Sequence, residues 1–186
     1  MILRDPSERA FSQYLHQLSV GLTRSTFREH VERCMRHRER KLGGYYPFLE
    51  VGLYSRQVRR YLDIFRRKNI QIYWYEEAWR QPARLLEDVF TFLNVDSTFH
   101  ADTSQRILQR RAPRFAAINY AVKQFAITHK VVTPSWLETT MSTLLFRNGA
   151  GLTMQSADRQ YLIHYYREDI LNLAHLLNHD LSAWLT

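Results

Sequence analysis

An arginine and a serine near the start of the chain have the types and the spacing to bind a tetrahedral anion. Arg4 follows the apolar run Met1–Leu3, which is typical of the end of a buried strand, and Asp5 and Pro6 can cap and begin a helix. Ser12 lies about two helical turns further on. A guanidinium at a strand end, a hydroxyl and the unpaired N–H groups of a helix N-terminus all favour a bound anion. The alternative is an ordinary strand–turn–helix with an exposed arginine and serine.

The residues around this pair resemble a known motif. The run L-R-D-P-S-E-R-A-F-S-Q-Y, from Leu3 to Tyr14, is similar to the 3′-phosphate-binding motif of sulfotransferases that use 3′-phosphoadenosine 5′-phosphosulfate (PAPS), in the bacterial and heparan-sulfate-type branch. In that family the arginine and serine of the motif hold the 3′-phosphate, which implies this role for Arg4 and Ser12. Three later segments match the family pattern in the same order: Gly52–Phe65, Ile70–Val95 and Asp158–Trp184.

The resemblance also implies a part of the fold that would come before Met1. Family members carry an earlier strand–loop–helix whose lysine and small residues cradle the 5′-phosphosulfate, and their catalytic base lies near that loop. Nothing before Arg4 matches this loop, and the glycines at Gly43-Gly44 and Gly149–Gly151 lack the lysine and the preceding strand. We therefore expect an N-terminally truncated or degenerate sulfotransferase with no catalytic residue of its own and little activity alone.

Tyr54 is a further candidate for the nucleotide pocket. It begins a segment in which apolar residues recur at three- and four-residue spacing, as on the buried face of a helix: Val58, Tyr61, Leu62 and Phe65. The segment resembles a family pattern whose tyrosine lies close to the nucleotide, which implies the same place for Tyr54. A packed core tyrosine is an equally good interpretation.

Three arginines around a proline lie in a predicted loop before a helix: Arg110, Arg111 and Arg114. Guanidinium groups gathered in this way suit a second clamp on phosphate. Related sulfotransferases have a late basic loop that closes over the nucleotide, although R-R-A-P-R departs from its usual pattern. Simple surface charge is the alternative.

A strongly basic helix is predicted over Phe27–Leu42, begun by a capping box of Thr26 and Glu29. Its basic face is either a contact surface for an anionic acceptor or an ordinary solvated face. His30 and His37 lie seven apart without an evident carboxylate partner, so no metal site is expected. The rival function from another class is a non-catalytic basic helical module that binds nucleic acid or another polyanion. The interleaved aromatics and docking helix that it would need are not evident, so nucleic acid is not the expected partner.

The composition fits a single domain over residues 1–186. The formal net charge of +8 favours anionic partners without choosing among a nucleotide, an acidic acceptor, nucleic acid and an anionic membrane surface. The lone Cys34 excludes an internal disulfide, and no run approaches the roughly 20 apolar residues of a membrane span. A cytoplasmic protein is expected.

The periodicity predicts two strands, near residues 1–3 and 70–75, among long helices. The predicted helices include Pro6–Val20, Pro82–Leu93, Ala116–Thr128, Pro134–Arg147 and Ser156–Leu177. The resemblance implies an α/β fold, an incomplete P-loop-kinase-like three-layer fold that is mostly helical with a small parallel sheet. The implied reaction transfers a sulfuryl group from PAPS, as co-substrate and without a metal, to a hydroxyl or amine acceptor, with carbohydrates among the candidates.

Overall fold

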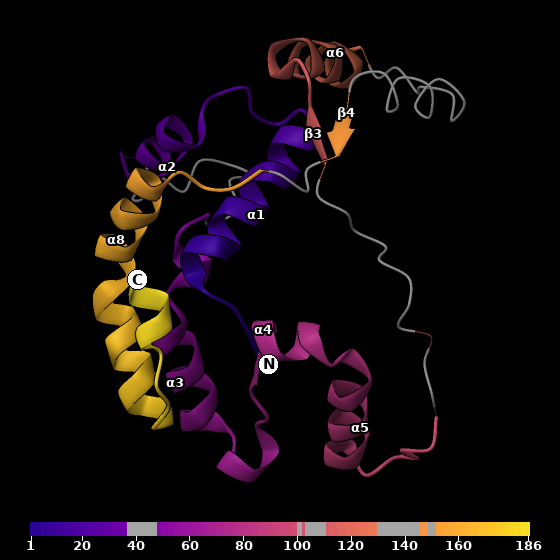
Figure 1. Ribbon diagram of the computed structural model, residues 1–186, viewed down its shortest axis with the longest axis vertical. Coiled ribbons are helices and arrows are strands. Elements are labelled where there is room, and N and C mark those ends of the chain that lie inside the picture. The colour runs from indigo at the N-terminus through magenta and orange to yellow at the C-terminus, as the bar shows by residue number, and fades with distance from the viewer. Residues whose placement is uncertain (37–47, 100–101, 103–110, 130–145, 149–151) are drawn as a thin grey trace. The chain divides into compact units, whose positions relative to one another are not determined.

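The computed structural model describes residues 1–36, 48–99, 102, 111–129, 146–148 and 152–186. Two compact units are assembled from segments that are far apart in the sequence, and Figure 1 labels their helices and strands. Unit 1 combines Met1–Pro6, Leu53–Leu108 and Tyr165–Thr186, and unit 2 combines Ser7–Gly52 and Gln109–His164. In the described ranges, no helix has both the length and the apolar character of a membrane-spanning segment.

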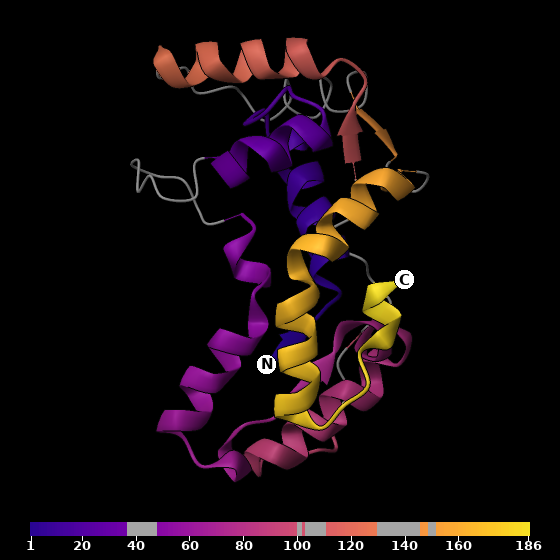
Figure 2. The ribbon, with the colours of Figure 1, turned by 90° about the vertical axis from the view of Figure 1, so that its left-hand side faces the viewer.

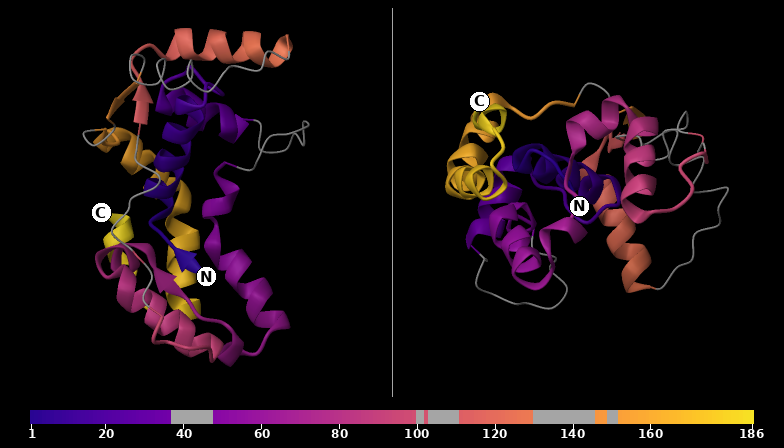
Figure 3. Two further views of the ribbon diagram at one scale, coloured as in Figure 1. Left: turned by 90° about the vertical axis from the view of Figure 1, so that its right-hand side faces the viewer. Right: turned by 90° about the horizontal axis from the view of Figure 1, so that it is seen from below.

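Unit 1 contains a two-stranded parallel sheet. In it β1 (Ile2–Leu3) pairs with β2 (Tyr73–Trp74), Ile2 opposite Tyr73 and Leu3 opposite Trp74, and Figure 3 shows the two arrows side by side. Both predicted strands are therefore present, but β2 is shorter than residues 70–75. A 3₁₀ turn, η2 (Arg67–Asn69), precedes it and α4 (Tyr75–Arg80) begins directly after it. Because the strands are parallel, both end at the same edge of the sheet.

Unit 1 also contains several helices. They are α3 (Tyr54–Ile64), α4, α5 (Pro82–Leu93) and the C-terminal half of α8 (Ser156–Leu177), followed by the 3₁₀ turn η4 (Ser182–Leu185). Figures 1 and 2 show α3 beside this half of α8. The core contains apolar residues from these elements and from the segments that flank η2 and η4: Tyr54, Val58, Ile70, Tyr166, Ile170, Leu173, Leu181 and Trp184.

A buried carboxylate fixes the start of α3. The Oδ2 atom of Asp169, on α8, accepts the Ser55 backbone N–H at 3.1 Å, and its other oxygen accepts the Ser55 hydroxyl. Ser55 is the second residue of α3, so the carboxylate satisfies one of the N–H groups that a helix N-terminus leaves unpaired and complements the helix dipole.

In unit 2, α1 (Pro6–Ser19) packs on α2 (Phe27–Arg36) through aromatic rings. Phe11 and Tyr14 of α1 each lie with ring centroids 5.1 Å from that of Phe27. His30 continues the cluster, 5.8 Å from Tyr14 and 4.7 Å from Phe48. The apolar face of α1 therefore meets the start of α2, as its periodicity requires.

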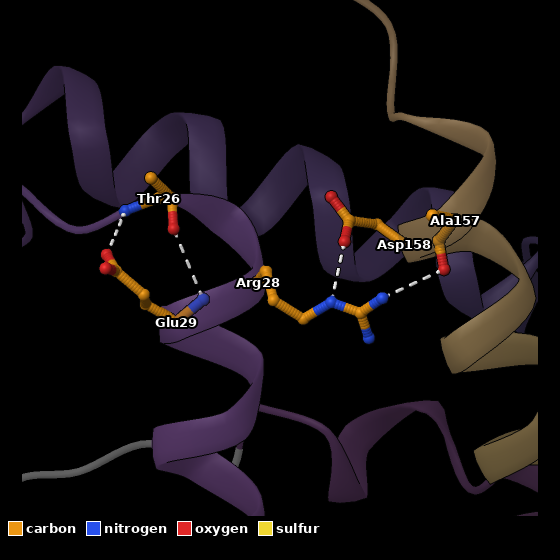
Figure 4. Close-up of polar contacts among 5 residues, drawn as sticks. All are labelled: Thr26, Arg28, Glu29, Ala157 and Asp158. Carbon is orange, nitrogen blue, oxygen red and sulfur yellow. Dashed lines mark hydrogen bonds and ion pairs between the residues drawn. The ribbon is translucent and has the colours of Figure 1, made fainter.

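The predicted capping box is present at the start of α2. The Thr26 N–H donates to Glu29 Oε2 at 2.9 Å, and the Glu29 N–H donates to Thr26 Oγ1 at 3.4 Å, as Figure 4 shows. The Thr26 N–H, and after it the Thr26 hydroxyl, hold the pKa of the Glu29 carboxyl below its usual value. The helix starts at Phe27 as predicted and is described to Arg36, while the remaining predicted part, residues 37–42, lies outside the described residues.

Arg28 joins α2 to the start of α8. Its Nε lies 3.0 Å from Asp158 Oδ1, and its Nη2 donates to the Ala157 carbonyl at 3.2 Å (Figure 4). The same guanidinium lies over the ring of Tyr161, with Cζ 4.1 Å from the ring centroid. At least this arginine of the basic helix therefore has a structural role rather than a contact with an acceptor.

A second small sheet corrects the sequence prediction. The strands β3 (Arg111–Pro113) and β4 (Phe146–Asn148) pair in antiparallel fashion, where a loop and the end of a helix over Pro134–Arg147 were predicted. Strands of three residues show too little alternation to be distinguished from a loop by periodicity.

The helix after β3 has the predicted bounds. This helix, α6 (Ala116–Thr128), contacts the end of α1 through Asn119, whose Nδ2 donates to the Leu18 and Ser19 carbonyls at 3.0 and 3.1 Å. Gly21, just beyond α1, has φ +72°, and a Cβ there would lie 2.6 Å from Lys123 Cγ. The turn after α1 thus requires glycine both for its backbone and for its closeness to α6.

Candidate functional site

Arg4 lies at the carboxyl edge of the parallel sheet, between β1 and α1. The side chain is half-buried, and its guanidinium carbon is 4.5 Å from the ring centroid of Tyr75. Tyr75 is the first residue after β2, so this contact joins the ends of the two parallel strands. Open α/β sheets bind ligands at this edge, and the N–H groups of an arginine that rests on a ring face point outward in the plane of its guanidinium.

The motif that contains Arg4 and Ser12 has the predicted local path. The strand ends at Leu3, α1 begins at Pro6, and the half-buried Ser12 lies in the second turn of that helix. Glu8, in the first turn, places a negative charge near the helix start, and Arg159 Nη1 offsets it at 3.7 Å from Glu8 Oε1. Arg4 belongs to unit 1 and Ser12 to unit 2, and their joint use in binding stays a prediction.

Tyr54 is the first residue of α3 and is only 7% exposed. Its ring centroid lies 6.3 Å from that of Trp184, and the bonds between Ser55 and Asp169 hold the helix start in place. These are the surroundings of a packed core tyrosine, one of the two interpretations of the sequence. A role for Tyr54 in a nucleotide pocket stays a prediction.

Of the three late arginines, Arg111 lies in a strand where the sequence predicted a loop. Arg111 is the first residue of β3, Arg114 is exposed just after that strand, and Arg110 lies outside the described residues. The pairing of β3 with β4 is the reason, because it draws this stretch into a ladder. A phosphate clamp made by these arginines stays a prediction.

The buried His30 and the half-buried Cys34 of α2 both have shifted pKa values. Burial, followed by the charge of Arg33, lowers the pKa of His30 to about 4, so its ring is neutral at physiological pH. Burial, with a smaller effect of Glu50, raises the pKa of Cys34 to about 11, so the thiol is protonated and a poor nucleophile. No group of three His, Cys, Asp or Glu side chains in the described part of the chain is placed to hold a metal ion.

Sequence reasoning missed two features of unit 1. One is Tyr75, the aromatic support of Arg4, which only the pairing of distant strands reveals. The other is a cavity of about 350 Å³ bounded by β2, α4 and α5. Charged residues of both signs along Glu77–Asp88 were its only sequence signal, and such a pattern is also typical of a solvated helix surface.

Fold and site together define a mostly helical α/β protein with a small parallel sheet, and an arginine lies at the carboxyl edge of that sheet, shortly before a helix. The family model described as "Sulfotransferase domain" matches residues 1–143, and the chain belongs to this family. This confirms the resemblance to PAPS-dependent sulfotransferases that the sequence indicated.

A solved structure agrees with the family assignment. The sulfotransferase from Alicyclobacillus acidocaldarius is similar to this chain with 25% sequence identity and a TM-score of 0.68, and the match covers 100% of this chain and 56% of that one. The predicted fold class is thereby confirmed, and the chain spans little more than half the length of that protein. Comparison with curated protein sequences gives no match.

Proposed function

We propose that this chain binds the donor nucleotide of a sulfotransferase, PAPS, and that Arg4 and Ser12 hold its 3′-phosphate. The observation that carries the proposal is the place of Arg4, half-buried against Tyr75 at the edge where both parallel strands end. It lies in the segment that matches the family, directly before the N-terminus of α1. A guanidinium, a hydroxyl and the partial positive charge of a helix N-terminus are the groups that phosphate prefers.

The reaction that follows is transfer of a sulfuryl group from PAPS to a hydroxyl or amine acceptor. The 3′-phosphate lies far from the reacting sulfur, so its binding energy serves to position the donor. Charge on the moving group has to be neutralised, as in phosphoryl transfer, and the acceptor has to lose a proton. We assign neither of these two tasks to a residue of this chain. The net charge of +8 attracts the anionic nucleotide from solution.

Calorimetric titration with adenosine 3′,5′-bisphosphate tests the proposal. We expect Arg4→Ala and Ser12→Ala to weaken binding about tenfold or more, because each removes a hydrogen bond to a charged group. Adenosine 5′-phosphate, which lacks the 3′-phosphate, should bind weakly and respond little to either substitution. Arg59→Ala, an exposed arginine of α3, and Ser19→Ala, at the end of α1, are the matched controls.

Equal binding of the two nucleotides, or binding that ignores both substitutions, would overturn the assignment of Arg4 and Ser12. Binding to any polyanion that falls steeply with salt and is unchanged in both variants would instead support the non-catalytic basic module.

A further inference from the structure

The cavity in unit 1 has the size of a small-molecule site. Its volume of about 350 Å³ lies at the lower end of the range for ligand pockets, roughly 300–1,000 Å³. The walls carry polar groups from three elements: Tyr73 from β2, Glu77 and Arg80 from α4, and Arg84 and Asp88 from α5. A ligand of about the size of a monosaccharide would therefore meet two cations, two anions and a phenol.

The four charged side chains are not engaged with each other. Glu77 and Arg80 are three residues apart on α4, and Arg84 and Asp88 are four apart on α5, spacings that bring opposite charges on a helix within reach. Within the described residues, none of these four side chains makes a hydrogen bond or an ion pair. All four are exposed, so their charges are available to a solute that enters the cavity.

The phenol of Tyr73 adds an unused group. Its oxygen is buried and has no hydrogen-bond partner among the residues that the structure describes. Burial, and then the negative charge of Asp88, raise the pKa of Tyr73, so the hydroxyl keeps its proton and can donate. A buried hydroxyl without a partner costs about 1–3 kcal/mol, which a ligand with a polar atom in reach would recover.

We propose that this cavity binds a small zwitterion, a molecule that carries a protonated amine together with a phosphate, sulfate or carboxylate group. Arg80 and Arg84 hold the anionic group, Glu77 and Asp88 hold the amine, and the Tyr73 hydroxyl donates to a polar atom. A solute with a single charge is attracted by one pair and repelled by the other, so the cavity favours a ligand with both charges. This inference does not depend on nucleotide binding at Arg4.

Three sugars with the same pyranose ring test the charge requirement: glucosamine 6-phosphate, glucosamine, and glucose 6-phosphate. Titrations are made in the Arg4→Ala background, so that phosphate binding at that residue does not contribute, and at mildly acidic pH, where amine and carboxylates are both ionised. We expect the first sugar to bind about tenfold or more tightly than either of the others. Equal affinities for the three sugars, or no binding of the first at millimolar concentration, would overturn the proposal.

Substitutions then test which cavity residue binds the phosphate and which binds the amine. Arg84→Gln should bring the affinity for glucosamine 6-phosphate down to that for glucosamine, and Asp88→Asn should bring it down to that for glucose 6-phosphate. The matched controls are Glu87→Gln, the neighbour of Asp88 on α5, and Arg59→Gln on α3, neither of which lines the cavity. Losses as large in the controls as in the cavity variants would show non-specific charge attraction and would refute the site.

Tyr73→Phe separates binding from folding. Removal of a buried hydroxyl without a partner leaves the melting temperature unchanged or raises it, whereas probe affinity should fall several-fold. A variant that melts lower and binds as tightly as the parent would contradict the role given to the phenol.

Discussion

Removing the Asp169 carboxylate should destabilise the N-terminal turn of α3. In Asp169→Ala the Ser55 N–H and hydroxyl lose their acceptors in a buried place, and the N-terminus of α3 loses a compensating charge. Hydrogen bonds to charged groups contribute about 1.5–3 kcal/mol each and a helix-terminus charge about 0.3–1 kcal/mol, while the cost of burying the carboxylate offsets part of this. We expect a net loss of about 3 kcal/mol.

Urea unfolding at neutral pH measures this loss, and hydrogen exchange of the α3 amides locates it. Asp169→Asn should lose about 1 kcal/mol, because its amide oxygen still accepts the Ser55 N–H and its amide nitrogen can donate to the Ser55 oxygen. A double-mutant cycle with Ser55→Ala should give a coupling energy of at least about 1 kcal/mol.

Glu168→Ala is the matched control, since Glu168 precedes Asp169 on α8 and is exposed. It should change stability by no more than about 0.5 kcal/mol. If Asp169→Ala behaved like this control, or if exchange increased evenly over the chain rather than in α3, the capping role would be refuted.

Two further predictions concern unit 2. The pKa of His30 is lowered from 6.5 to about 4, so the unfolded chain takes up the proton first as pH falls. The free energy of unfolding should therefore fall by roughly 3 kcal/mol between about pH 6.5 and pH 4. In His30→Leu, the urea midpoint should change less with pH over this range. Parallel profiles for the two proteins would contradict this. Gly21→Ala should cost about 1–2 kcal/mol, seen as a lower melting temperature, because φ is +72° and the new Cβ would lie 2.6 Å from Lys123 Cγ and 3.0 Å from the Asn119 carbonyl oxygen. An unchanged melting temperature would show that the turn relaxes without cost.

Helices with strong local signals could be predicted from the sequence. The bounds of α6 and α8 match the prediction, and the Thr26–Glu29 capping box and Pro6 mark the starts of α2 and α1. In each case the signal lies within a few residues of the feature, so no knowledge of tertiary contacts was needed.

Strands were harder to predict because pairing, not local preference, decides their length. The aromatic run Tyr73–Tyr75 favours a strand, yet pairing with β1 involves only Tyr73 and Trp74, and Tyr75 already belongs to α4. Strand preference reflects packing against neighbours, which a single sequence does not display. The β3–β4 ladder was missed for the same reason.

The candidate site was predictable only in part. Arg4 and Ser12 could be found because they lie in one short motif that resembles a family pattern. The cavity is lined by residues 73–88 alone, but the charged residues of this stretch are equally typical of a solvated surface. Tyr75 could not be found either, because its contact with Arg4 depends on the pairing of two distant strands. Residues that are close in space but distant along the chain leave no periodic signal.

Pairing of β1 with β2 also has a kinetic consequence. The two strands are separated by about 70 residues, so the chain entropy of closing this loop is lost before the strand contacts can offset it, and the parallel pair should assemble late in folding. During synthesis on the ribosome, Arg4 emerges long before Tyr75, so the contact between the two side chains cannot form until the second strand is made. The rate at which nucleotide-binding protein is recovered after dilution from denaturant would then report closure of this loop rather than growth of the helices.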